Sequence, residues 1–77
     1  MNTKYKTRDL YLAAYLQAIG THMEAPMRVG SRVEFVFSLG PNEDGEELTH
    51  EYFSGQGQVS AGKFAQAIKS LKSLVHS

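Results

Sequence analysis

Apolar residues dominate one stretch near the amino end of the chain. Residues 10–19 read Leu-Tyr-Leu-Ala-Ala-Tyr-Leu-Gln-Ala-Ile, in which Gln17 is the one polar residue. Thr7 can cap a helix that Gly20 closes, so the sequence predicts a helix over residues 8–19. A helix that is apolar on all sides has to be buried on all sides.

A β-hairpin is expected next. Residues 32–38 alternate, with a valine and two phenylalanines on one side and mainly polar side chains on the other, which is the period of a half-buried strand. Gly30-Ser31 suits a tight turn between this strand and residues 22–29, because glycine accepts positive φ. Pro26 has no N–H for a strand ladder, so the first arm is expected to lie at an edge or to break there.

A short acidic helix follows in the predicted order. Asn42 or Asp44 can cap it, and Gly55 can terminate it just after Phe53. Residues 48–53 are also compatible with a third strand, because they are few and include two aromatic residues that favour pleated surfaces.

The last segment has the period of an amphipathic helix, which Ser60 can cap. Its apolar stripe comprises Phe64, Ile68, Leu71 and Val75. The sequence thus predicts one α+β domain over residues 1–77, with the hairpin packed on helices. Its elements in order are a helix, a hairpin, a short helix or third strand, and a C-terminal helix.

The size of the chain limits how well it can cover its apolar helix. A chain of 77 residues removes only roughly 60% of its unfolded surface from water, and it has no cysteine for a disulfide or a zinc site. Oligomerisation is the support that remains, so we expect a homodimer in which two hairpin edges join into one sheet. The predicted interface comprises Tyr11, Leu12, Tyr15, Leu16 and Ile19. The alternative is a monomer whose tyrosine hydroxyls lie at the surface.

Charge is unevenly distributed along a chain that is neutral overall. Residues 1–42 carry a net +2, residues 43–51 carry −5, and the remainder carries +3. A solvated surface explains such runs, and the alternative is an acidic patch that docks on a basic partner. No apolar signal segment follows Met1, and the longest uncharged run is shorter than the ~18 residues of a membrane span, so a cytoplasmic protein without membrane contact is expected.

Nucleic-acid binding is the alternative function. The candidate contacts are Lys4, Lys6, Arg8, Lys69 and Lys72, with Tyr5 and Tyr11 available to stack on bases between them. The isoelectric point near 6.8 argues against it, because nucleic-acid domains usually have a strongly basic footprint.

Two motifs imitate active chemistry. The spacing from Gly57 to Lys63 matches a phosphate-binding loop, but Phe64 occupies the place of the Ser or Thr that holds magnesium. The simpler expectation is an anion at a helix start formed by Ser60, Gly62 and Lys63. Glu47 and His50 have the Glu-x-x-His spacing of di-iron bundles but lack the additional buried carboxylates. We therefore predict no catalytic residue, no metal and no cofactor, and a nucleotide- or metal-dependent enzyme ranks third.

Four segments carry a resemblance to a known family. They are Tyr5–Ala14, with its Tyr-x-Thr-x-Asp-Leu-Tyr-Leu-Ala-Ala pattern, the Phe-Val-Phe strand at 35–37, Glu-Tyr-Phe at 51–53, and Lys-Ser-Leu-Lys at 69–72. They resemble a small domain of unknown function from prokaryotes and their viruses. The resemblance implies a shared fold and a phage or mobile-element setting, and it transfers no functional residue. The residues themselves favour a non-catalytic binding or assembly module that acts as a homodimer.

Overall fold

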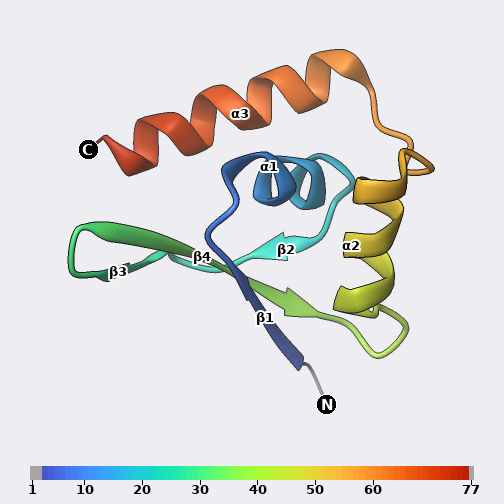
Figure 1. Cartoon of the computed structure of the whole chain (residues 1–77), viewed down its shortest axis with the longest axis horizontal. Coiled ribbons are helices and arrows are strands. Elements are labelled where there is room, and N and C mark those ends of the chain that lie inside the picture. The colour runs from blue at the N-terminus through green and yellow to red at the C-terminus, as the bar shows by residue number, and fades with distance from the viewer. Residues whose placement is uncertain (1–2, 77) are drawn as a thin grey trace.

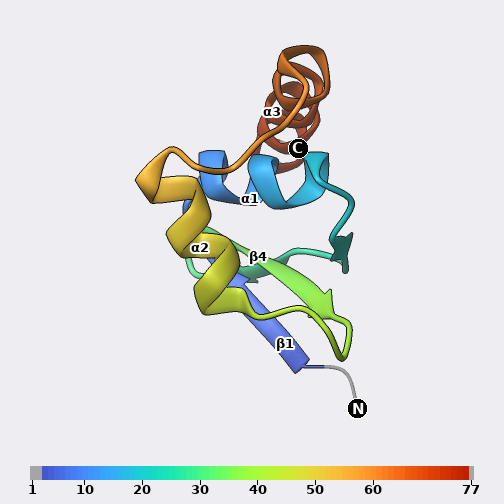
Figure 2. The same cartoon turned by 90° about the vertical axis from the view of Figure 1, so that its right-hand side faces the viewer.

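The computed structural model describes residues 3–76, which form three layers (Figures 1 and 2). An antiparallel sheet forms the first layer, and α1 (Leu10–Ala18) lies on one of its faces. Helix α3 (Ala61–Val75) covers the side of α1 that faces away from the sheet, and α2 (Gly45–Ser54) packs beside α1. The predicted α+β class is confirmed.

The sheet is built around its longest strand. Strand β4 (Arg32–Leu39) pairs with β1 (Thr3–Thr7) on one side, and with β2 (His22–Met23) and β3 (Met27–Val29) on the other. All pairings are antiparallel. Strand β1 is not predicted by the sequence pattern, because it has one apolar residue, Tyr5, and no alternation of apolar and polar positions. Its place in the sheet depends on the pairing with β4.

The predicted hairpin is present, with its first arm divided. Gly30 has a φ of +64° in the turn that joins β3 to β4. Residues 24–26 separate β2 from β3, and Pro26 lies at this break, as its missing N–H predicted. The second arm is thus present as β4, and the first arm is divided into two short strands.

Helix α1 begins later than the predicted 8–19, because a different residue caps it. Asp9 is the N-cap, and its Oδ1 accepts hydrogen bonds from the backbone N–H of Tyr11 at 3.0 Å and of Leu12 at 3.1 Å. Thr7, the predicted cap, instead ends β1 and accepts a hydrogen bond from the N–H of Asp9. A short carboxylate placed directly before the helix satisfies two end donors, which the more distant threonine cannot reach.

The other two helices have the predicted caps. Asp44 accepts a hydrogen bond from the N–H of Glu46 at 2.9 Å, and Gly55 ends α2 in the left-handed region with a φ of +77°. Residues 48–53 are therefore helical, and the third-strand alternative is wrong. Ser60 is the N-cap of α3, as expected.

Helix α1 is covered within one chain. Its buried residues are Leu12, Ala13, Ala14, Tyr15 and Leu16. Phe35 and Phe37 of β4 and Leu71 of α3 belong to the same core, and Tyr52 of α2 adds a ring 5.4 Å from that of Tyr15. The expectation that one chain lacks enough material to cover this helix is wrong, because α3 packs along α1 and adds its apolar side chains to the same core.

Candidate functional site

The predicted dimer face on α1 lies mostly inside the molecule. Leu12, Tyr15 and Leu16 are 2%, 4% and 1% exposed, and Ile19 is half-buried. A contact through the first three would require the core of the chain to open. Tyr11 alone among the five predicted interface residues is an exposed side chain, at 48%. Dimerisation stays a prediction, but the need to cover an exposed apolar helix no longer supports it, because one chain covers α1.

Two exposed aromatic side chains, Tyr11 and Phe53, and the half-buried Tyr52 lie on α1 and α2, which contact each other. We call Tyr11, Tyr52 and Phe53 the aromatic patch. Phe53 is 65% exposed, and its ring meets that of Tyr52 edge-on with centroids 4.9 Å apart. Partial burial raises the pKa of Tyr52, and the nearby Asp9 carboxylate and Tyr11 phenol raise it further. Helices α1 and α2 are in contact here, and the ring of Tyr52 lies 5.4 Å from that of Tyr15 on α1.

Tyr15 connects this surface to the loop that follows α2. Burial raises the pKa of its phenol, and the Glu51 carboxylate adds to the effect. A Cβ at Gly57 would lie 2.4 Å from the Tyr15 Oη and 2.7 Å from its Cζ, so only glycine allows the loop to pass this close. Sequence reasoning missed this contact, since nothing in the local pattern pairs Gly57 with a tyrosine on α1.

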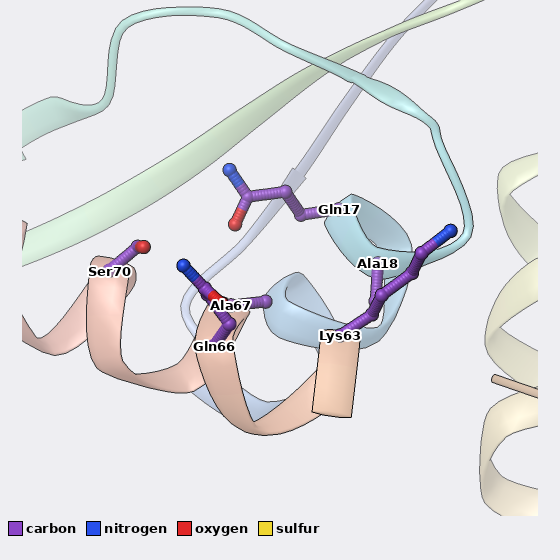
Figure 3. A pocket seen from close by; sticks show the side chains of 6 residues that line it. All are labelled: Gln17, Ala18, Lys63, Gln66, Ala67 and Ser70. Atoms are coloured by element: carbon purple, nitrogen blue, oxygen red, sulfur yellow. The ribbon is translucent and has the colours of Figure 1, made fainter. Parts of the chain in front are cut away.

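A groove of about 410 Å³ lies between α1 and α3 (Figure 3). Its lining consists of Gln17, Ala18, Lys63, Gln66, Ala67 and Ser70. The Gln17 amide points toward the Gln66 and Ser70 part of α3, whereas the Lys63 side chain extends past Ala18 in the other direction. Gln17 Oε1 is buried and has no hydrogen-bond partner among the described residues. Gln17 is the polar exception in an otherwise apolar segment of the sequence, but that pattern alone predicts no site.

The predicted nucleic-acid contacts fall on two opposite outer layers. Lys4 and Lys6 pair with Ser38 and Val36 of β4 and thus lie on the sheet face away from α1, while Arg8 is exposed between β1 and α1. Lys69 and Lys72 are exposed on α3, on the far side of α1. The structure does not bring the two groups together.

Two of these predicted contacts already have partners within the chain. Lys4 forms an ion pair with Glu24. The hydroxyl group of Tyr5 shares a hydrogen bond of 2.7 Å with Thr49 Oγ1, and a Cβ at Gly45 would lie 2.5 Å from its ring. Tyr5 therefore packs against α2 and is not placed to stack on a base.

The remaining candidates lie at helix surfaces. Ser60 uses its hydroxyl oxygen to accept a hydrogen bond from the N–H of Lys63 at 3.5 Å, and Gly62 and Lys63 are exposed beside it. Glu47 and His50 are exposed on α2. Within residues 3–76, no group of three or more His, Asp or Glu side chains is arranged to hold a metal ion. None of the helices in that range has the length and apolar character needed to cross a membrane.

The fold and these surfaces define the class as a small α+β domain with a buried central helix. The family model described as "Domain of unknown function (DUF5659)" matches residues 2–77. The chain belongs to this family. No curated protein and no solved structure matches it. The description of the family states no function.

Proposed function

We propose that this chain is a non-catalytic binding and assembly module of the cytoplasm that acts as a homodimer. The observation that carries the proposal is the exposure of the aromatic patch, with Phe53 at 65% and Tyr11 at 48%. Aromatic side chains are enriched in protein interfaces because a rigid ring buries much apolar area with little loss of conformational freedom. Tyr11 also belongs to the interface that the sequence predicted.

The charges around the patch favour a second copy as the partner. Residues 43–51, which form most of α2 and the end of the loop before it, carry a net charge of −5, whereas the exposed Arg8 precedes α1. A two-fold axis through the patch places the basic side of each protomer opposite the acidic side of its partner. Because the chain is neutral overall, this association accumulates no net charge.

Sedimentation equilibrium of the wild type and of Phe53→Ser tests this proposal. We expect the wild type to sediment as a dimer at high concentration and Phe53→Ser to sediment at the 8.5 kDa of one chain. Phe53 is mostly exposed, so its replacement leaves the core intact.

Val29→Ser is the matched control, because Val29 is 54% exposed but lies on β3, away from the patch. It should sediment like the wild type. A wild type of 8.5 kDa at every concentration would overturn the homodimer. Loss of the dimer in Val29→Ser alone would move the contact to the hairpin edge and overturn the aromatic interface.

The competing sequence-based function is association with nucleic acid in a phage or mobile-element setting. It predicts binding that weakens steeply with added salt, because bound phosphates release counterions. A mobility-shift assay that stays blank at low salt would discard it.

A further inference from the structure

Strand β1 leaves one edge of the sheet open. Strand β4 is paired on both of its sides, whereas β1 has β4 on one side and, within residues 3–76, no strand on the other. The opposite edge of the sheet is divided into β2 of two residues and β3 of three, with Pro26 in the break. Short strands are poor templates for a further strand, but β1 runs without interruption over five residues. The continuous open edge is therefore that of β1.

The pairing of the strands shows which backbone groups of β1 face outward. The N–H of Glu24 donates to the carbonyl of Val36 at 2.8 Å, on the β2 side of β4. Because successive residues of a strand direct their backbone groups to opposite sides, Phe37 directs its N–H and C=O toward its β1 partner, Tyr5. The residues on either side of Tyr5 therefore direct their N–H and C=O groups away from the sheet.

Lys4 and Lys6 are these two residues. No hydrogen bond among residues 3–76 satisfies the backbone groups that they turn outward. Their side chains are exposed and lie together on the sheet face away from α1. Lys4 forms an ion pair with Glu24, whereas Lys6 has no ion pair in the described part of the chain. The edge thus offers unused backbone donors and acceptors beside positive charge.

A second copy of β1 is a poor partner for this edge. Antiparallel pairing about a two-fold axis at Tyr5 places Lys4 of each copy opposite Lys6 of the other. An axis at either lysine places that lysine opposite itself. Like charges directly opposite each other in a sheet are destabilising, so each register that pairs these outward groups is disfavoured. The charges of β1 therefore select a partner strand of opposite sign.

We propose that the open edge of β1 binds an extended acidic segment of a partner protein, which adds to the sheet as a fifth strand. In strand addition, main-chain hydrogen bonds supply the affinity. Residues of an antiparallel partner that lie opposite Lys4 and Lys6 point to the same sheet face as these lysines, so carboxylates at two alternate positions of the partner meet them. The Lys4–Glu24 pair is solvent-exposed and therefore weak, so Lys4 can turn to a new carboxylate at little cost.

This site extends the proposed binding function without resting on the homodimer. Strand β1 contains no residue of the aromatic patch. Binding of an acidic segment and self-association can therefore fail separately, and each has its own experiment.

A titration of the ¹⁵N-labelled full chain with the acetylated and amidated peptide Val-Glu-Val-Glu-Val, followed by NMR, tests the proposal. We expect the backbone amide signals of Lys4 and Lys6 to shift more than that of Tyr5, because the Tyr5 N–H already faces β4. The same peptide with lysine in place of both glutamates should bind more weakly. Equal binding of the two peptides would refute selection by charge.

A second probe separates strand addition from simple attraction between charges. The glutamate peptide with an N-methyl group on both glutamates keeps its charges but loses the two N–H donors that would face the carbonyls of Lys4 and Lys6. It should shift neither signal, and retained binding would overturn the proposal. An oligothymidylate that shifts the same signals at a lower concentration than the glutamate peptide would assign the edge to nucleic acid and would also overturn it.

Two charge reversals locate the site. Lys6→Glu should weaken binding of the glutamate peptide by about tenfold, because a facing pair of opposite charges becomes a pair of like charges. The Lys6 side chain is exposed, so the fold should tolerate this change. Lys72→Glu is the matched control, since it alters the net charge equally but lies exposed on α3, and it should leave the affinity unchanged. Equal effects of the two variants would refute a site at β1.

Discussion

Replacing Leu16 by alanine tests how α1 is covered. Leu16 is 1% exposed, with the sheet on one side of its helix and α3 on the other. The substitution deletes three carbon groups at roughly 0.8 kcal/mol each, or about 2.4 kcal/mol of lost transfer free energy. Because packed elements on both sides limit collapse of the cavity, the total should reach about 3–5 kcal/mol.

Leu74→Ala provides the matched comparison, since the same atoms are removed from a side chain that is 37% exposed on α3. It should cost about 1 kcal/mol or less. Urea unfolding followed by circular dichroism gives both free energies of unfolding at a single protein concentration. Leu16→Ala that costs no more than Leu74→Ala would refute the burial of α1 between the sheet and α3.

Three further predictions concern other contacts of the same core. Gly57→Ala should lower the free energy of unfolding by about 1–3 kcal/mol, because its Cβ would meet the buried Tyr15 ring. In the control Gly62→Ala the nearest neighbouring atom to the added Cβ lies at 3.8 Å, so this variant should not be less stable than the wild type. Equal effects of the two variants in thermal unfolding would contradict this prediction. Asp9→Ala should lower the free energy of unfolding by about 1 kcal/mol and Asp9→Asn by much less, because aspartate and asparagine side chains can both cap α1. If chemical denaturation shows that Asp9→Asn is as destabilising as Asp9→Ala, the negative charge of Asp9 and not its capping hydrogen bonds stabilises the helix. Burial raises the pKa of Tyr15 and of Tyr52, so the folded chain holds these phenolic protons more tightly than the unfolded chain, and this contribution to stability is full below the ordinary tyrosine pKa of about 10 and is lost as pH rises through the raised pKa values. The free energy of unfolding of Tyr52→Phe should therefore fall less steeply with alkaline pH than that of the wild type. An equally steep fall would argue against a raised pKa at Tyr52.

Signals that act over a few residues were readable from the sequence. Asp44, Gly55 and Ser60 define helix ends through hydrogen bonds and backbone angles that depend on near neighbours. Pro26 divides the first hairpin arm for an equally local reason, its missing N–H. These residues gave the order of the helices and the hairpin.

Features that depend on distant partners were not readable in the same way. Strand β1 is stabilised by its pairing with β4, whose residues lie 28 to 36 positions further along the chain. The pattern of α1 showed that it had to be buried but not that α3 would cover it. The aromatic patch likewise requires α2 to contact α1. The Gln17 groove was signalled by one polar residue in an apolar run, but its lining comes mostly from α3.

The most direct test of the account is urea unfolding of Phe53→Ser at a concentration where sedimentation equilibrium shows it to be monomeric. The account predicts a cooperatively folded monomer, because the sheet, α2 and α3 of one chain bury α1 while the aromatic patch serves only association. A variant that unfolds as it dissociates would contradict this, since α1 would then depend on a second chain for its cover.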